Sequence, residues 1–276
     1  QKHGFKVAIL AQPDWRSAEP FRIFGPPRLF WGITSGSIDS SLNAYTSLGH
    51  KRREDVYSPG GRLGLRPEKP LLAYAARARE AFKNIPIILG GLEASLKRLV
   101  YFDYIENQLK RSILIDSKAD MLVYGMAEYA VLAIANGLAS GKSIRDLTNI
   151  PGTAYPAFKD VAIAADCVEL PSFEQQKCNA ELVMQAHLQY QQQTANNKPV
   201  IQPHEGAPSV VVMPPAPALD EKTMDEIYAM PFTRRWHPMY DSLGGVAALE
   251  PVQTSITTHR GCFGGCAFCS LYFHQG

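Results

Sequence analysis

The feature that most constrains the fold is the alternation of short apolar runs with longer segments of helical periodicity in the first half of the chain. Residues 85–89 and 121–124 are almost entirely apolar, are too short for a helix, and are each followed by glycine. Runs of this kind are typical of strands covered on both faces. Strands that alternate with helices favour an open, largely parallel sheet, so we predict the α/β class.

The same pattern predicts where the individual elements lie. Apolar residues recur at helical spacing in three segments, which we predict to be helices: 68–82, 127–138 and 172–193. Short runs of apolar or β-branched residues predict five strands: 6–10, 28–33, 85–89, 121–124 and 209–213. Residues 252–257 alternate apolar and polar side chains, which predicts one more strand directly before a group of cysteines.

Glycine-containing loops follow two of the predicted strands. Residues 90–95 are Gly-Gly-Leu-Glu-Ala-Ser, and residues 125–128 are Gly-Met-Ala-Glu. Ligands of open α/β sheets bind beyond the carboxyl ends of the strands, so both loops are candidate binding positions. The alternative is ordinary turn chemistry, in which glycine allows a tight turn and the acid lies near a helix N-terminus.

The composition divides the chain into three segments. Residues 1–160 carry the alternating pattern and form the predicted α/β domain. Residues 161–250 hold a helical segment, a polar run and five prolines between Pro203 and Pro217, and we predict a helical and proline-rich connector. Residues 251–276 begin a further unit, in which a strand leads directly into the cysteine loop.

Charge and hydropathy exclude several classes of protein. The chain has 28 basic and 26 acidic residues, a net charge of +2, and no run of five like charges, so we expect no nucleic-acid partner. No apolar stretch approaches 18 residues, and no signal peptide is visible, so we expect a cytoplasmic protein without a membrane partner. Because the sequence starts at Gln1 and stops at Gly276 in mid-pattern, we expect a fragment truncated at both ends.

Several common motifs fail on spacing. Residues 141–143, Gly-Lys-Ser, lack the earlier glycine of a phosphate-binding loop and follow a predicted helix rather than a strand. No G-x-G-x-x-G, G-x-S-x-G or H-E-x-x-H string occurs. The acidic pairs Glu54 with Asp55 and Asp103 with Glu106 are interpreted as solvated charge, because nothing in the sequence brings them together.

Three of the five cysteines form a motif that passes the spacing test. Cys262, Cys266 and Cys269 are arranged as C-x3-C-x2-C on one short loop, and thiolates this close can converge on one metal centre. Cys167 and Cys178 lie apart from this loop, and small buried hydrophobic side chains are their default interpretation. The three clustered cysteines are therefore the predicted metal ligands.

The loop leaves the fourth metal ligand open. Gly264 and Gly265 supply the backbone freedom that a curled loop needs. Closed iron–sulfur sites and structural zinc sites normally use four protein ligands. Either a fourth ligand comes from elsewhere, with His259 and His274 the nearest, or one metal position is left free for catalysis.

The cysteine spacing, following a predicted strand and Arg260-Gly261, resembles the radical S-adenosylmethionine (radical SAM) superfamily. The resemblance implies that the three cysteines hold three irons of a [4Fe–4S] cluster. It implies that the amino and carboxylate groups of S-adenosylmethionine chelate the fourth iron. Phe268, the aromatic residue before the third cysteine, would pack near the adenine.

Four strings together resemble the YgiQ family of radical SAM proteins: residues 11–15, 90–95, 254–269 and 273–276. This resemblance implies a Rossmann-like N-terminal domain, similar to cobalamin-binding domains, ahead of a partial (β/α) barrel. A full barrel takes about 250 residues, whereas seven residues follow Cys269. The expected fold is therefore an α/β domain followed by the first strand and cluster loop of a truncated barrel.

The resemblance also implies an activity for the full-length protein. A reduced cluster would cleave S-adenosylmethionine to a 5′-deoxyadenosyl radical, with an electron donor such as flavodoxin or ferredoxin as a partner and an unknown substrate. The fragment itself is not expected to turn over. Cobalamin is a further cofactor of such domains, but the string D-x-H-x-x-G, whose histidine ligates cobalt, does not occur in this chain.

Two alternatives to a radical SAM enzyme stay open. The first is a zinc-stabilised binding module without catalysis, in which His274 or His259 completes a Cys3His site. The second is a non-catalytic α/β domain that binds a cobalamin-like ligand or a partner protein.

Overall fold

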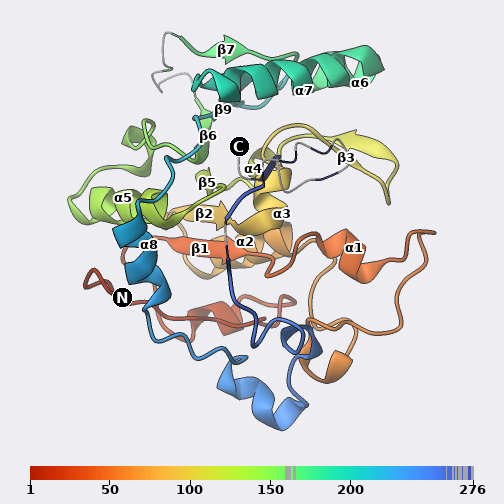
Figure 1. Ribbon diagram of the computed structural model, residues 1–276. Helices are drawn as coiled ribbons and strands as arrows, with labels where there is room; N and C mark the ends of the chain where they lie inside the picture. Colours follow the sequence, from red (N-terminus) through yellow and green to blue (C-terminus); the bar gives the residue numbers. More distant parts are fainter. Residues whose placement is uncertain are drawn as a thin grey trace.

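A seven-stranded mixed sheet organises the chain (Figure 1). In the computed structural model, which describes residues 1–158, 163, 166–258, 260–262, 264, 266, 269, 273 and 274, the strand order is β1-β2-β5-β6-β9-β8-β7. The pairs β1-β2, β2-β5 and β7-β8 are parallel, and the other three pairs are antiparallel. The strands in chain order are β1 (Trp31–Thr34), β2 (Ile87–Gly90), β5 (Met121–Val123), β6 (Thr153–Ala157), β7 (Val168–Glu169), β8 (Val200–Gln202) and β9 (Ser209–Val212).

A separate antiparallel hairpin and several helices complete the structure. The hairpin consists of β3 (Tyr101–Asp103) and β4 (Gln108–Lys110). The helices in chain order are α1 (Ser40–Ala44), α2 (Pro70–Ala81), α3 (Gly91–Leu96), α4 (Ile113–Asp116), α5 (Glu128–Ala139), α6 (Phe173–Cys178), α7 (Ala180–Ala195) and α8 (Glu221–Tyr228).

The central strands are buried on both faces, which explains their unbroken apolar runs. Successive side chains of a strand point to opposite faces. In β2, Ile87 and Leu89 join one hydrophobic cluster while Ile88 joins the other. In β9, Val210 and Val211 divide between the two clusters in the same way. A strand in this position has no solvent face, so it needs no polar residues.

Helices supply the other half of each cluster. Residues of α2, α3, α4 and α7 pack in the first cluster, and residues of α5 pack in the second. Leu71 in α2, Leu114 in α4 and Ile134 in α5 are all fully buried. The result is three layers, with the sheet between helices on its two faces, and the prediction of the α/β class is confirmed.

Most predicted elements are present, with ends that lie within three residues of the predicted ones. The strand predicted at 28–33 is β1, the one at 85–89 is β2, and the one at 121–124 is β5. The predicted helices 68–82 and 127–138 are α2 and α5. Burial on both faces makes these segments recognisable from composition alone.

Two predicted strands are not formed. Residues 6–10 pair with no strand in the described part of the chain, and Val7 and Ile9 are 55% and 68% exposed. Residues 252–257 are also without a strand, and Ile256 is 83% exposed. Both segments have strand-like composition, but a strand exists only when a neighbour accepts its backbone hydrogen bonds. The expected first barrel strand is therefore not formed in this chain.

The helix predicted at 172–193 is two helices, α6 and α7. Asn179 separates them with an extended backbone at φ −140° and ψ 111°, and its side chain accepts a hydrogen bond from the backbone N–H of Glu181. Asparagine is a favoured helix N-cap, because its side-chain oxygen satisfies an N–H that lacks a partner. The apolar periodicity continues across the break, which is why the sequence predicted one helix.

The sheet is parallel only in part. Antiparallel β6 and β9 lie between the parallel group β1-β2-β5 and the parallel pair β7-β8. The prediction of a largely parallel sheet is therefore correct only for those two groups. Three strands within residues 161–250, the predicted connector, belong to this same sheet. In the described part of the chain, no helix has both the length and the apolarity needed to cross a bilayer.

Gly91, directly after β2, packs too closely for a side chain. Its φ is +84°, and a Cβ there would collide with the Oγ1 of Thr34 at the end of β1. We expect Gly91→Ala to lower the free energy of unfolding by about 2 kcal/mol or more, because backbone strain and overpacking add. Urea denaturation measures the loss.

Gly141 provides the matched control. Its φ is +87°, but a Cβ there would meet nothing within 4 Å. Gly141→Ala therefore carries the backbone strain alone, which is about 1 kcal/mol. Equal losses for the two variants would show that the contact with Thr34 is not a constraint.

Candidate functional site

Buried polar residues gather where the parallel strands β1 and β2 end. Thr34 and Gly90, the last residues of these strands, lie opposite each other in the sheet. Directly beyond them, the carboxylate of Glu93 in the first turn of α3 accepts hydrogen bonds from the backbone N–H of Ser40, at 3.2 Å, and from its hydroxyl, at 2.6 Å. The loop at 90–95 thus begins a helix whose acid ties α3 to α1.

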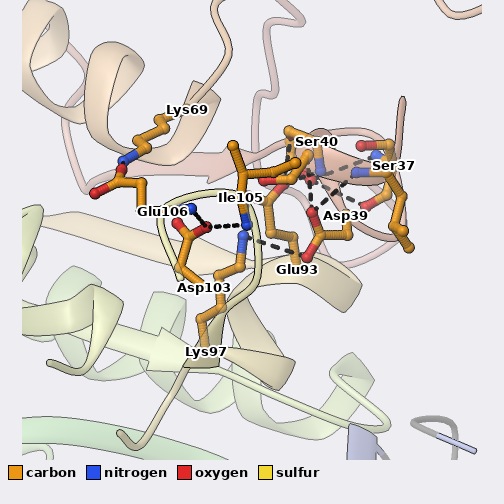
Figure 2. A network of polar contacts seen from close by, with 12 residues as sticks. Ser37, Asp39, Ser40, Lys69, Glu93, Lys97, Asp103, Ile105 and Glu106 are labelled. Carbon is orange, nitrogen blue, oxygen red and sulfur yellow. Dashed lines mark hydrogen bonds and ion pairs between the residues drawn. The ribbon is translucent and has the colours of Figure 1, made fainter. Parts of the chain in front are cut away.

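Lys97 completes this network, which Figure 2 shows from close by. Its ammonium lies 2.9 Å from a Glu93 oxygen and 3.4 Å from an Asp39 oxygen. Burial opposes the charge on Lys97, but the two carboxylates outweigh it, and the pKa of Lys97 is raised above its ordinary value. This contribution to stability is complete below the pKa of a free lysine, about 10.4, and is lost as the pH rises through the higher folded pKa.

The acidic pairs in the sequence do not form two-carboxylate sites. Asp55 is buried and binds the guanidinium of Arg66 through two hydrogen bonds, of 2.8 and 3.0 Å. Burial alone would raise the pKa of Asp55, but the hydrogen bonds from Arg66 and Ser58 lower it overall. The interpretation of Asp55 as solvated charge is therefore wrong.

Asp103 and Glu106 also act separately from each other. Asp103 is buried and accepts hydrogen bonds from the backbone N–H groups of Ile105 and Glu106, both at 3.1 Å, so it caps the hairpin turn (Figure 2). Glu106 binds Lys110 and Lys69, and these hydrogen bonds lower its pKa to about 2. Asp103 is structural rather than solvated, and Glu106 takes part in surface ion pairs.

Two of the three predicted cysteine ligands share one small space. A Cβ added to Gly264 would lie 3.3 Å from the sulfur of Cys262 and 3.5 Å from the sulfur of Cys266. The two sulfurs can be no further apart than the sum of these distances. Both residues are exposed, whereas Cys269 is partly buried and donates its backbone N–H to the carbonyl of Cys266 at 2.9 Å. Both thiols therefore lie against Gly264, with the backbone N–H of Gly264 3.4 Å from the sulfur of Cys262 and its carbonyl oxygen 3.8 Å from the sulfur of Cys266.

Three thiols are the kind of donor that a thiophilic metal centre needs. The sulfur of Cys269, however, does not lie beside Gly264 with the sulfurs of Cys262 and Cys266. Three thiols are soft ligands suited to iron–sulfur clusters and to zinc. Within the described residues, no group of three or more histidine, cysteine, aspartate or glutamate side chains is close enough to hold a metal. Phe268 and His259 lie outside the described residues.

His274 is the candidate fourth ligand that lies among the described residues. It is partly buried, and its Nδ1 has no hydrogen-bond partner in the described part of the chain. Burial, and secondarily the charge of Arg98, lower the pKa of His274. Cys178 is exposed, and burial raises the pKa of the half-buried Cys167 thiol to about 11, which disfavours a reactive thiolate.

Both ends of the cysteine loop are attached to the α/β layers. Before the loop, the guanidinium of Arg260 binds the carboxylate of Glu128, at the start of α5, and the hydroxyl of Tyr228 at 3.0 Å. After the loop, the backbone carbonyl of Phe273 accepts a hydrogen bond of 2.6 Å from Arg98. The loop at 125–128, predicted as a candidate binding position, is the first of these attachment points.

Arg98 is the residue that sequence reasoning missed. It follows α3, is fully buried, and contacts the rings of Tyr124, Tyr190 and Phe273. No motif marks it, because its three aromatic partners are scattered along the chain. Only the tertiary structure brings them together.

Comparison with known proteins places the chain in a family. The sequence model of the family described as Radical SAM N-terminal matches residues 1–255, so the chain belongs to this family. The matched region ends before the first clustered cysteine, Cys262. The resemblance based on the cysteine spacing and the family match therefore rest on different residues and agree.

Curated relatives match the chain over its whole length. A UPF0313 protein of Clostridium botulinum strain ATCC 19397 is 44% identical over 278 residues, which cover 100% of this chain and 43% of that protein. A UPF0313 protein of Geobacter sulfurreducens is 41% identical, covering 99% of this chain and 45% of its own length. The chain thus spans less than half the length of these relatives.

One solved structure is also similar to the chain. It is the radical S-adenosylmethionine methyltransferase TsrM from Kitasatospora setae, with 14% sequence identity and a TM-score of 0.33. The match covers 51% of this chain and 19% of that chain. A similarity at this level carries no argument about fold or function.

The buried pair of Glu93 and Lys97 should dominate the stability of this region. We expect Glu93→Gln to cost roughly 3 kcal/mol of unfolding free energy, because it leaves a buried ammonium with a single, more distant carboxylate. Urea denaturation at neutral pH measures the change. Glu106→Gln, which removes two exposed ion pairs, with Lys69 and Lys110, should cost about 2 kcal/mol at the most, since each exposed pair is worth about 0.2–1 kcal/mol. Similar losses in the two variants would contradict this account.

Proposed function

We propose that this chain supplies the cluster ligands of a radical SAM enzyme and the α/β domain that supports them. Cys262, Cys266 and Cys269 would each bind one iron of a [4Fe–4S] cluster. The observation that carries the proposal is that the thiols of Cys262 and Cys266 both lie against Gly264, in a chain that belongs to the radical SAM N-terminal family.

The residues of the loop suit this role for separate reasons. Thiolates are the ligands of iron–sulfur clusters, and glycine at 264 lets the sulfurs of Cys262 and Cys266 approach the backbone more closely than a Cβ would readily allow. Cys262 and Cys266 are exposed, so a cluster can be inserted and can be reached by a small molecule. Three protein ligands leave one iron free for the amino and carboxylate groups of S-adenosylmethionine. When bound, a reduced cluster supplies the electron that starts radical chemistry on this molecule.

The proposal also specifies partners and surroundings. S-adenosylmethionine and a one-electron donor such as flavodoxin or ferredoxin are required, and the substrate is left open. Phe268 would contact the adenine. The cysteines of the described chain are free thiols, as is usual in a reducing compartment, so we propose the cytoplasm. Cobalamin is not part of the proposal, because no residue of the chain is assigned to it.

Zinc is the second candidate, and His274 is the observation in its favour. The buried Nδ1 of His274 lacks a partner, and burial favours the neutral imidazole that can ligate a metal. A Cys3His zinc site would close the fourth position and leave no place for a substrate. Anaerobic reconstitution with iron and sulfide, described next, distinguishes the zinc module from the enzyme.

We expect the full-length protein, reconstituted anaerobically with iron and sulfide, to acquire equal amounts of both and a brown colour that dithionite bleaches. With S-adenosylmethionine and reductant it should release 5′-deoxyadenosine. Cys262→Ala, Cys266→Ala and Cys269→Ala should each abolish this product, because a cluster lacking one ligand is not held in place. Metal analysis, absorbance and chromatography are the measurements.

Cys167→Ala and Cys178→Ala are the matched controls, and both should retain the cluster. A colourless protein with one tightly bound zinc ion would support the zinc module instead. A stable cluster that never cleaves S-adenosylmethionine would limit the chain to a binding role.

A further inference from the structure

A buried positive charge without a carboxylate partner lies beside the cysteine loop. Arg98 is fully buried, and its guanidinium donates to the backbone carbonyls of Ser95 and Phe273 and to the hydroxyl of Tyr190. Among the described residues, its Nε has no hydrogen-bond partner. None of the contacts of this group in the described chain is a carboxylate, so neutral groups must offset the cost of burying the charge.

Aromatic faces provide most of the remaining compensation. The guanidinium carbon lies 4.0 Å from the ring centre of Phe273, 4.3 Å from that of Tyr124 and 5.1 Å from that of Tyr190. Cation–π contacts are stronger when the cation is removed from water, as the buried guanidinium of Arg98 is. Arginine suits the position because its planar group stacks on rings and donates at its edge simultaneously.

The partners of Arg98 come from two parts of the chain. Tyr124 follows β5 and Tyr190 lies in α7, so both belong to the layers around the sheet. Phe273 lies four residues after Cys269 and supplies both a ring and a carbonyl. It also packs against Tyr190, with ring centres 5.3 Å apart. If Phe273 left, the buried charge would lose its nearest aromatic face and one of its acceptors.

We propose that Arg98 is a positioning residue for the metal cluster, holding the segment after the third cysteine against the sheet. The inference rests on the proposed function, because it concerns the same cluster. Arg260 and Glu128 fix the loop at its other end, so the two attachments limit how far the three thiols can spread. The sulfur of Cys269 does not lie beside Gly264 with the other two sulfurs. Of the three cysteines, Cys269 is the nearest in sequence to Phe273, the residue that Arg98 binds.

The test uses full-length protein with the cluster reconstituted. Arg98→Gln removes the charge, Arg98→Lys keeps the charge but not the planar group, and Phe273→Leu removes only the ring. Ile134→Ala is the control for destabilisation, because Ile134 is fully buried in the hydrophobic cluster that does not include Phe273. Iron release to a chelator and the electron paramagnetic resonance spectrum of the reduced cluster are measured below the unfolding temperature of every variant.

We expect Arg98→Gln to release iron roughly 10-fold faster than the wild type, as is typical when a residue supporting a metal ligand is lost. Phe273→Leu should also release iron faster than the wild type. The rate for Arg98→Lys should lie between those of the wild type and Arg98→Gln. The resonance spectrum should shift in these variants and not in Ile134→Ala. If Arg98→Gln does not fold, Phe273→Leu decides. Wild-type release and an unshifted spectrum in folded variants would overturn the inference.

A second measurement does not need the cluster. In the metal-free protein, iodoacetamide should alkylate Cys269 faster in Arg98→Gln and Phe273→Leu than in the wild type or Ile134→Ala. If the wild type binds no cluster, the proposed function fails, and this measurement still shows whether Arg98 holds the loop. Equal alkylation rates would contradict the attachment itself.

Discussion

The parallel pairing of β1, β2 and β5 brings the segments that contact both sides of the cysteine loop to one edge of the sheet. Parallel strands bring their carboxyl ends to one edge, so the segments that follow them meet there. Glu93 and Arg98 come after β2, and Tyr124 and Glu128 come after β5. Both attachments of the cysteine loop are to residues of this group. The loop is thus held near this edge by the topology of the sheet, through contacts that no local motif specifies.

Two consecutive residues at this edge bury positive charge by different means. Lys97 has a compact ammonium and is neutralised by two carboxylates. Arg98 has a broad, weakly hydrated guanidinium and is surrounded by rings and carbonyls. The contacts of Lys97 with Glu93 and Asp39 join α3 to α1, and all of these residues belong to the α/β domain. The arginine network is complete only when the segment after the cysteines is in place, so it can couple that segment to the sheet.

The sequence correctly predicted the strands that are buried on both faces. It predicted strands wrongly where strand formation depends on a neighbouring strand that accepts the backbone hydrogen bonds. The apolar runs of β2 and β5 identify them because those strands have no solvent face. Residues 6–10 and 252–257 have similar local composition, but no neighbouring strand accepts their hydrogen bonds. The antiparallel position of β9 between β6 and β8 depends on long-range pairing, which periodicity does not encode.

The candidate site likewise has residues that a local sequence pattern predicts and residues that only the tertiary structure brings together. Spacing alone led to the prediction of Cys262, Cys266 and Cys269 as metal ligands, because metal ligands close together in sequence leave a local pattern.

Arg98 and its aromatic partners left no such pattern, since their contacts join residues up to 175 positions apart. The family match ends at residue 255, ahead of the cysteines. The contacts from Arg260 to Glu128 and from Arg98 to Phe273 nevertheless join the matched region to the loop on both sides. The α/β domain would therefore be physically part of the site proposed for the cysteines, because its residues contact the chain on both sides of them.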